Sequence, residues 1–93
     1  MKDGKYIDSS GTERWYLNGK RHREDGPATI HTNGTEQWWQ HGKRHREDGP
    51  AILLKYKNTK YWYINNEELT ESEFLIWKEG KEFDEMMREL LTE

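Results

Sequence analysis

The first two thirds of the chain alternate short runs of aromatic or β-branched residues with turn-forming residues. Three pairs of such runs occur, over residues 5–9 and 13–18, 28–32 and 36–40, and 51–56 and 60–64. Runs of this length bounded by Gly, Asn, Asp and Ser are typical of β-strands. Asn33-Gly34 favours a tight hairpin, because both turn positions need a positive φ. The pattern therefore predicts six short strands, arranged as three hairpins in an antiparallel β-meander.

The last quarter of the chain changes its period to that of a helix. The main apolar series is Ile76, Phe83, Met87 and Leu90. A capping box precedes it, with Thr70 as N-cap and Glu73 at the third helical position. We expect a helix from about 71 to 92 that bends or breaks at Gly80, because glycine costs about 1 kcal/mol against alanine inside a helix. The fold class is thus α+β, a meander followed by a C-terminal helix or helix pair.

A ten-residue block, Gly-Lys-Arg-His-Arg-Glu-Asp-Gly-Pro-Ala, occurs at residues 19–28 and again at residues 42–51. A third, decayed copy aligns at the same offset, Tyr61-Trp62 with Trp38-Trp39 and Asn65 with Gly42. A period of about 23 residues indicates one supersecondary unit that is copied and stacked. We interpret the block as the joint that carries the chain from one hairpin into the next.

The aromatic residues of the repeats fall on both faces of the predicted sheet. Because successive side chains of a strand point to opposite faces, one face carries Trp15, Trp38 and Tyr61. The other face carries Tyr16, Trp39 and Trp62. A single helix covers one face only, so the other is left for a partner. We expect one domain in all, with a hairpin repeat region at 1–69 and a helical segment at 70–93 that packs on the sheet or self-associates.

Composition narrows the chemistry. Only 31% of the residues are apolar and 35% are charged, and there is no cysteine, which excludes disulfides, thiolate metal sites and a cysteine nucleophile. Residues 1–69 carry twelve Lys and Arg against ten Asp and Glu, whereas residues 70–93 carry three against eight. The mildly basic repeats and the acidic tail either face charged partners or attract each other. No apolar run approaches the ~20 residues of a membrane span, and residues 1–4 lead into a polar strand, so we expect neither a membrane nor a secretion signal.

Two aromatic residues followed after two positions by this block form a pattern that resembles a divergent MORN-like repeat, which occurs in tandem in small proteins of bacteriophages and large DNA viruses. The resemblance covers residues 11–65 in two full copies and one decayed copy, in which Asn66-Glu67-Glu68-Leu69 replaces the basic residues. Residues 69–74 resemble the helical end-piece that follows the last copy in this family. The resemblance implies a β-hairpin array used for binding and not for chemistry.

The sequence offers no set of residues for an enzyme. It has no glycine-rich phosphate loop, no paired carboxylates in an apolar setting and no nucleophile beside a base. We therefore predict a non-enzymatic protein without cofactor, metal or small-molecule substrate. His22 and His45 each precede an Asp by three residues and have the chemistry of a metal ligand or a general base. We favour hydrogen bonds to the backbone of the neighbouring repeat, because a duplicated connector requires only that.

The main prediction is a protein–protein interaction module, a homodimer located in the cytoplasm, or in the host cytoplasm if the protein is viral. The viral resemblance suggests a small phage-type protein that binds and modulates or inhibits a host defence factor. The candidate partner-binding aromatics are Trp15, Tyr16, Trp38, Trp39 and Trp62. The candidate acidic helix face comprises Glu79, Glu82, Asp84, Glu85 and Glu89. The apolar series of the helix is then core or subunit contact.

Two alternatives stay open. One is a single-stranded nucleic-acid-binding protein, since such proteins combine cations for phosphates with rings for bases. Its candidate contacts are Lys20, Arg21, Arg23, Lys43, Arg44 and Arg46. Against it, Glu24-Asp25 and Glu47-Asp48 follow directly and the pI is about 5.8, and each Arg can instead lie over a Trp or pair with an adjacent acid. The other alternative is a purely structural repeat or assembly protein.

Overall fold

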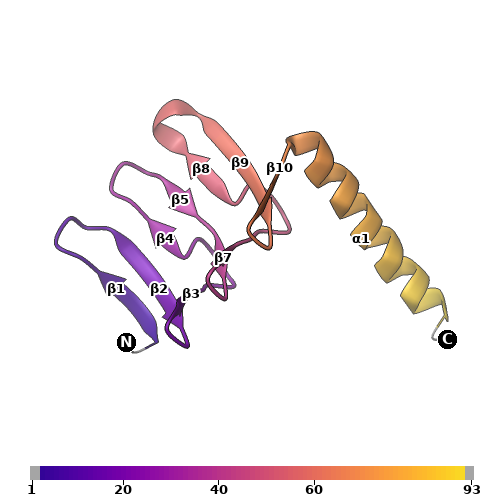
Figure 1. Ribbon diagram of the computed structural model, residues 1–93, viewed down its shortest axis with the longest axis horizontal. Helices are drawn as coiled ribbons and strands as arrows, with labels where there is room; N and C mark the ends of the chain where they lie inside the picture. The colour runs from indigo at the N-terminus through magenta and orange to yellow at the C-terminus, as the bar shows by residue number, and fades with distance from the viewer. Residues whose placement is uncertain (1–2, 92–93) are drawn as a thin grey trace.

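The computed structural model describes residues 3–91, and it confirms the α+β class with an antiparallel sheet followed by one helix. The strands are β1 (Gly4–Ile7), β2 (Glu13–Leu17), β3 (Lys20–Arg21), β4 (Thr29–Ile30), β5 (Glu36–Gln37), β6 (Trp39–Gln40), β7 (Lys43–Arg44), β8 (Ile52–Leu54), β9 (Thr59–Ile64) and β10 (Glu67–Leu69), with a 3-10 turn η1 (Lys55–Lys57) and helix α1 (Glu71–Leu91). The three predicted hairpins are β1–β2, β4–β5 and β8–β9. Figure 1 shows them side by side in one sheet of order β1-β2-β4-β5-β8-β9-β10, in a molecule that measures 52 × 32 × 18 Å.

The hairpin region has more strands than the six predicted, because the repeated block contributes strands of its own. After β2, β6 and β9 the chain turns back at once and pairs as β3, β7 and β10. The turns are Asn18-Gly19, His41-Gly42 and Asn65-Asn66, and both residues of each turn have a positive φ. Turns of this kind match the twist of adjacent antiparallel strands. The block therefore begins with a two-residue strand and continues as the joint to the next hairpin.

The third copy is shifted by one residue against the period of the first two. Thr29 pairs with Arg14 and with Gln37, which occupy equivalent positions of the first two copies. Ile52 is the equivalent of Thr29, and it pairs with Gln37 and with Tyr61. A constant period would put Lys60 opposite Ile52, so Tyr61 lies one residue too far along the chain. The extra residue lies in the β8–β9 turn, where the chain forms η1. The alignment of Tyr61-Trp62 with Trp38-Trp39 was therefore wrong by one position.

This shift changes which rings share a face. Residues opposite each other on paired strands point to the same face, so Tyr61 lies on the face of Gln37 and the adjacent Trp62 lies on the face of Trp38. The tryptophan row, as we call it, is Trp15, Trp38 and Trp62. The mixed row on the other face is Tyr16, Trp39 and Tyr63. The predicted grouping of Trp62 with Tyr16 and Trp39 is thus wrong, and Tyr63 takes its place.

The core is small and largely polar. Its buried apolar residues are Ala28, Ala51, Ile52 and Phe74, and its buried polar residues are Thr12, His22, Thr29, Thr35 and His45. Both alanines close the repeated block, where a larger side chain would separate the hairpins. A core of this kind depends on hydrogen bonds between the repeats more than on apolar area.

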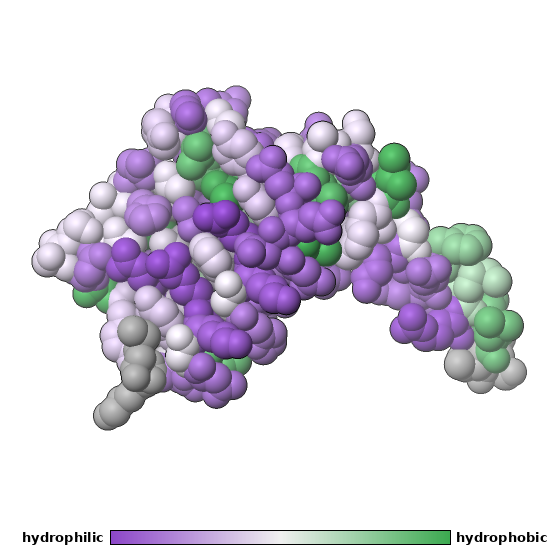
Figure 2. Space-filling model, in the orientation of Figure 1, coloured by the Kyte–Doolittle hydropathy of each residue, from purple (hydrophilic) through white to green (hydrophobic). Residues whose placement is uncertain are grey.

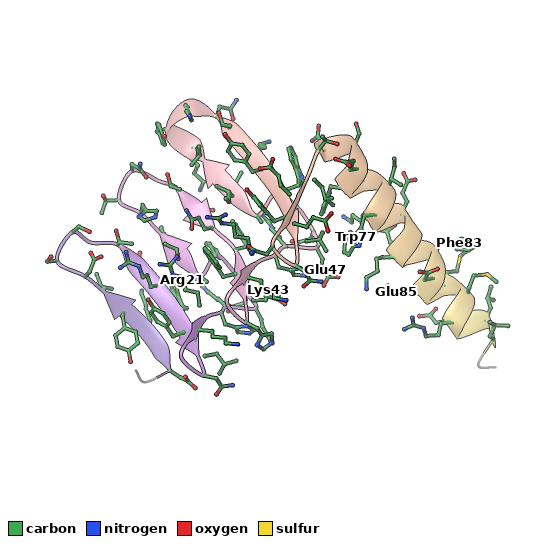
Figure 3. All side chains as sticks on the ribbon, viewed as in Figure 1. Arg21, Lys43, Glu47, Trp77, Phe83 and Glu85 are labelled. Carbon is green, nitrogen blue, oxygen red and sulfur yellow. The ribbon has the colours of Figure 1, made fainter. Side chains whose placement is uncertain are left out.

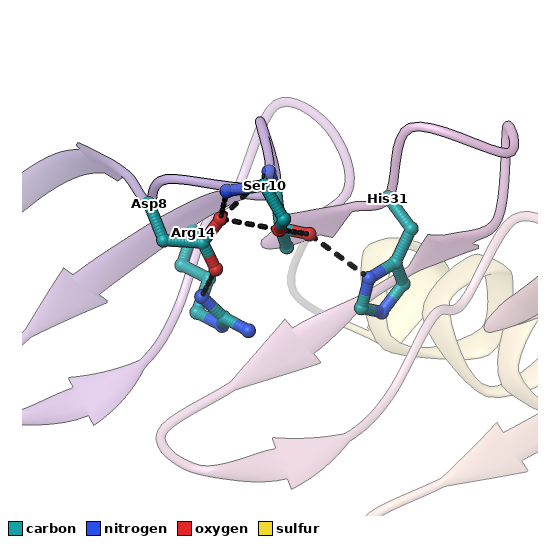
Figure 4. Close-up of polar contacts among 5 residues, drawn as sticks. Asp8, Ser10, Arg14 and His31 are labelled. Atoms are coloured by element: carbon teal, nitrogen blue, oxygen red, sulfur yellow. Dashed lines mark hydrogen bonds and ion pairs between the residues drawn. The ribbon is translucent and has the colours of Figure 1, made fainter.

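The first hairpin turn is tied by a single carboxylate. Asp8 Oδ1 accepts hydrogen bonds from the backbone of Ser10 and Thr12 (2.9 and 3.1 Å) and from the Ser10 hydroxyl (2.6 Å), while Oδ2 accepts one from Arg14 (2.7 Å). These donors, above all the Ser10 hydroxyl and then Arg14, hold the pKa of Asp8 well below its usual range. Thr12 Oγ1 lies 3.4 Å from Nδ1 of His31 in the next hairpin (Figure 4).

Helix α1 starts where the capping box predicts. The Thr70 backbone N–H donates to Glu73 Oε1 at 2.9 Å, and the Glu73 N–H donates to Thr70 Oγ1 at 3.1 Å. The expected break at Gly80 is wrong, since the helix runs unbroken to Leu91. The cost of one glycine, about 1 kcal/mol, is too small to outweigh the hydrogen bonds on either side of it.

The helix does not cover a face of the sheet either. It touches β9 and β10 near its first turns, where Phe74 is buried, and then leaves the sheet at an angle (Figure 1). Trp77 stacks beside Phe74 with the ring centres 6.0 Å apart. Within residues 3–91, no helix is both long and apolar enough to cross a membrane.

Candidate functional site

The histidines of the duplicated block join consecutive repeats. His22 and His45 are 7% and 6% exposed. The Nδ1 atom of His22 accepts a hydrogen bond from the His41 backbone N–H, and that of His45 accepts one from the Asn65 N–H, both at 3.0 Å. Because Nδ1 is the acceptor, the neutral ring carries its proton on Nε2, which for His45 faces Glu47 at 3.0 Å. The interpretation of these histidines as backbone partners across the repeat is confirmed.

The second arginine of each block is fully engaged within the repeat. The Arg23 guanidinium lies 4.0 Å from the Trp15 ring centre, and its Nε and Nη1 donate to Asp25 (2.9 Å) and to the Pro27 carbonyl (3.2 Å). The second copy has the same contacts, with Arg46 at 3.8 Å from Trp38, 2.8 Å from Asp48 and 3.1 Å from the Pro50 carbonyl. The sequence left open whether each arginine lies over a tryptophan ring or pairs with an adjacent acid, and in the structure each does both.

The charges in this joint satisfy each other. The hydrogen bond from Arg23 lowers the pKa of Asp25, and the one from Arg46 lowers the pKa of Asp48. A Cβ at Gly26 would lie 2.9 Å from Arg23 Cζ, so a larger residue there would displace the guanidinium from its present position. Arg23 and Arg46 are therefore structural, and they have little charge left for an external ligand.

A groove of about 370 Å³ lies between the two copies of the block. It is lined by the acidic pairs Glu24-Asp25 and Glu47-Asp48, together with Trp38 and Arg46. Asp25 and Asp48 already pair with arginines. The wall of the groove therefore consists mostly of groups that stabilise the joint.

Two arginines without an ion pair within residues 3–91 lie over the mixed row. The Arg21 guanidinium lies 5.1 Å from the Trp39 ring centre, and that of Arg44 lies 5.2 Å from Trp39 and 5.4 Å from Tyr63. In contrast to Arg23, neither forms an ion pair with a residue of 3–91. Arg44 Nε is buried without a hydrogen-bond partner in the described chain.

The two lysines that precede these arginines, Lys20 and Lys43, are exposed and likewise form no ion pair within residues 3–91. A second groove, of about 320 Å³, lies between the first two copies and is lined by Tyr16, Lys20, Arg21 and Trp39. Arg21 and Lys43 are labelled in Figure 3. These four cations, which we call the open cations, are Lys20, Arg21, Lys43 and Arg44.

The third copy carries acids and a leucine where the second copy carries cations and a histidine. In the register that the strand pairing sets, Glu67, Glu68 and Leu69 stand where Lys43, Arg44 and His45 stand in the second copy. The Tyr63 hydroxyl donates to Glu68 Oε1 at 2.9 Å, and burial together with this acid raises the pKa of Tyr63. The leucine has no acceptor to offer a further repeat.

The predicted partner-binding aromatics do not form a bare surface. Trp15, Tyr16, Trp38, Trp39 and Trp62 are all half-buried, and guanidinium groups lie over three of them. Tyr63 belongs with them and was missed, because the extra residue in the third copy hid the register. The adjacent asparagines at 65 and 66, which suit a positive-φ turn, were the available signal.

The predicted acidic helix residues do not form one face. At about 100° per residue, Glu82, Glu85 and Glu89 lie together, whereas Glu79 and Asp84 flank the apolar series on either side. Three basic residues, Lys78, Lys81 and Arg88, lie among the acids on the same half of the helix. The helix is therefore amphipathic and not simply acidic.

The apolar series of α1 is exposed. We call it the apolar stripe, and its large side chains are Ile76 (71% exposed), Phe83 (58%), Met87 (38%) and Leu90 (60%). Figure 3 shows Phe83 directed away from the sheet, while Trp77 and Glu85 are directed toward it. Figure 2 shows hydrophobic residues gathered at the far end of the helix, in contrast to the hydrophilic hairpin region.

Neither a metal-ligand cluster nor a similarity to known proteins assigns a function to these surfaces. Within residues 3–91, no three His, Asp or Glu side chains come together as metal ligands. Comparisons with protein-family models, with curated proteins and with solved structures found no match to this chain.

Proposed function

We propose that this chain is a non-enzymatic protein-interaction module whose binding element is helix α1. The observation that carries the proposal is the apolar stripe. A surface helix normally turns its apolar side toward the core of its own domain. Here that side faces away from the sheet, and its four large side chains are between 38% and 71% exposed. Contiguous exposed apolar surface of this kind is typical of sites of protein association.

The hairpin repeats serve as the rigid base for this helix. The histidine and arginine joints fix each hairpin to the next, and Phe74 with the capping box fixes the start of α1 on the last hairpin. The helix is thereby held away from the sheet in one direction. Such a preorganised element loses less conformational entropy when it binds.

The resemblance to MORN-like repeats of bacteriophages supports a more specific version of this proposal. In it, the chain is a small phage-type protein that acts in the host cytoplasm and binds a host factor, modulating or inhibiting host defence. This version rests on the resemblance alone and on no contact within the chain.

The proposal is tested by binding experiments with a stripe variant. Tagged protein is incubated with a nuclease-treated bacterial lysate and with untagged copies of itself, and the proteins retained are compared between the wild type and Phe83→Ser. Glu85→Ser, on the opposite side of the helix, is the matched control. We expect Phe83→Ser to lose proteins that the wild type and the control retain. If all three retain the same proteins, or none, the helix is not the binding element.

A second candidate function, single-stranded nucleic-acid binding, is favoured by the open cations. They have no carboxylate partner in the described chain, and Arg21 and Arg44 lie over rings, as phosphate and base contacts require. Guanidinium groups already occupy Trp39, so phosphate contacts would dominate over base stacking. Arg23 and Arg46 take no part in this candidate function, because they are paired with Asp25 and Asp48.

Salt dependence tests this candidate. Each phosphate contact adds about 0.7 to the slope of log affinity against log salt for a single strand. Binding of an oligonucleotide should therefore lose about one such increment in Lys43→Gln and none in Lys60→Gln, which lies outside the open cations. Equal slopes for the two variants would exclude the open cations as phosphate ligands.

A further inference from the structure

Gly80 is the residue of α1 that the chain itself does not explain. It lies in the interior of an unbroken helix and is absent from the glycines with a positive φ. A Cβ added there would meet no atom within 4 Å. Alanine would fit and would stabilise the helix, so neither backbone conformation nor internal packing requires a glycine.

The position of Gly80 in the helix suggests a reason for the glycine that lies outside the chain. Ile76, Gly80, Phe83, Met87 and Leu90 follow one another at intervals of four, three, four and three residues. This alternation is the heptad spacing by which two helices pack along a common seam. Gly80 is the one small residue of that seam, and it lies one step before the largest, Phe83. The seam therefore has a gap and a knob of complementary size.

We propose that α1 pairs antiparallel with α1 of a second copy of this chain, so that Phe83 of each copy packs onto Gly80 of the other. This inference rests on the proposed function and names its partner. In an antiparallel pair, an a position of one helix lies level with a d position of the other. With Gly80 level with Phe83 of the second copy, Ile76 is level with Met87 of the second copy. The two-fold axis repeats both contacts, as expected for an isologous interface.

Charge decides the direction of the pair. Residues 71–91 contain seven acidic and three basic side chains, a net charge of −4. In a parallel pair, Glu79 lies beside Asp84 of the other helix on both sides of the seam, and these like charges repel. In the antiparallel pair, Glu79 lies beside Met86 of the second copy, and Asp84 beside Trp77 of the second copy. The antiparallel arrangement also opposes the two helix dipoles.

The direction of the stripe leaves room for the second helix. Phe83 points away from the sheet (Figure 3) and α1 leaves the sheet after its first turns (Figure 1). Its 21 residues extend over about 31 Å, so two helices can lie side by side along most of their length. A single helix pair falls at the small end of stable interfaces. We therefore expect a dissociation constant on the order of micromolar and not nanomolar.

One helix variant, Gly80→Ala, should weaken the dimer while it stabilises the helix of the monomer, which makes the test specific. Light scattering and sedimentation from about 1 μM to 1 mM should show a monomer–dimer equilibrium for the wild type. Gly80→Ala should raise the dissociation constant at least about tenfold, because a methyl group fills the place of Phe83. The same variant should raise the helix content of the dilute monomer. The control Glu82→Ala, on the other side of the helix, should leave the dissociation constant unchanged within about twofold.

Direction is tested with disulfides, since the chain has no cysteine. The double variant Ile76→Cys/Met87→Cys places two thiols level in the antiparallel pair and should form a covalent dimer on oxidation. Met87→Cys alone should not, because its thiols then lie about 16 Å apart, beyond the reach of a disulfide. A covalent dimer from Met87→Cys alone would overturn the antiparallel direction.

The outcomes separate this inference from the proposed function. A wild type that remains monomeric to about 1 mM, or a dimer that Gly80→Ala strengthens, overturns the self-pairing. If such a monomer still retains another protein in a Phe83-dependent way, the interaction module stands and only the second copy is excluded. If Phe83→Ser changes neither self-association nor retention, both are excluded.

Discussion

Replacing His45 by alanine is the most direct test of how the repeats are held together. The ring is 6% exposed, and its Nδ1 accepts the Asn65 backbone N–H at 3.0 Å, which ties the second repeat to the third. The substitution removes this acceptor and leaves a void where the imidazole was. Two backbone hydrogen bonds also join these repeats, from Arg46 to Tyr63 and from Asn66 to Arg44, so the substitution weakens the joint without removing it.

The size of the effect follows from these two losses. A backbone donor that loses its acceptor costs about 1–3 kcal/mol, and the lower end applies because Asn65 is exposed and water can reach it. The cavity that remains after the surroundings partly collapse into the place of the ring adds about 1 kcal/mol to this cost. We therefore expect a loss of about 2 kcal/mol in the free energy of unfolding, which in a domain of this size lowers the melting temperature by about 8–16 °C.

Urea unfolding followed by tryptophan fluorescence measures this loss as a change in midpoint at constant slope. His45→Asn is the informative companion, because its Oδ1 is attached to Cγ as Nδ1 is in histidine and can accept the same bond. It should recover about half of the loss. His31→Ala, at a half-buried ring with a long contact of 3.4 Å to Thr12, should change stability by less than about 0.5 kcal/mol. If His45→Ala is as stable as His31→Ala, the histidine joint does not hold the repeats together.

Three further predictions follow from other contacts. The pKa of Asp8 lies below its ordinary value of 3.8, so the folded chain binds fewer protons than the unfolded one. This contribution to stability is present above pH ~4 and is lost as the pH falls. The difference between the urea midpoints at pH 7 and pH 3 should therefore be smaller in Asp8→Asn than in the wild type. Arg46→Lys keeps the charge but loses the flat contact with Trp38 and the hydrogen bond to the Pro50 carbonyl, and should cost about 1–2 kcal/mol in the same unfolding assay, whereas Lys60→Arg should cost nothing measurable. Phe74→Ala should cost about 3 kcal/mol and release α1 from the sheet, which hydrogen exchange would record as lost protection in the first turns of the helix; unchanged protection there would show that Phe74 does not anchor it.

Several features that depend on neighbouring residues were readable in the sequence, although the break expected at Gly80 does not occur. The turn at Asn18-Gly19 follows from residues that tolerate a positive φ, whereas at Asn33-Gly34 only the glycine has the positive φ that was expected of both. The start of α1 follows from Thr70 and Glu73, which bond to each other's backbone. The role of the block as a joint followed from its duplication. These signals are local, because a turn or a cap is made by residues within a few positions of each other.

The features that depend on contacts between repeats were decided by the tertiary structure. One extra residue in the β8–β9 turn moves Trp62 to the face of Trp38 and brings Tyr63 into the mixed row. In the sequence alone, the 23-residue period instead aligns Tyr61-Trp62 with Trp38-Trp39. The decision lies in the pairing of Ile52, since a strand shifted by one residue turns every side chain to the other face. The adjacent asparagines at 65 and 66, both with a positive φ, are the local trace of that choice.

The same holds for the charges and the helix. The sequence placed four arginines in two identical blocks, but only the fold pairs Arg23 and Arg46 with carboxylates and leaves Arg21 and Arg44 over rings without an ion pair in the described chain. The sequence likewise determined the start and the apolar period of α1, whereas the contact of Phe74 with the last hairpin decided that the apolar stripe points away from the sheet. Helix formation depends on residues three and four positions apart, but the direction of a helix depends on what its first turn packs against.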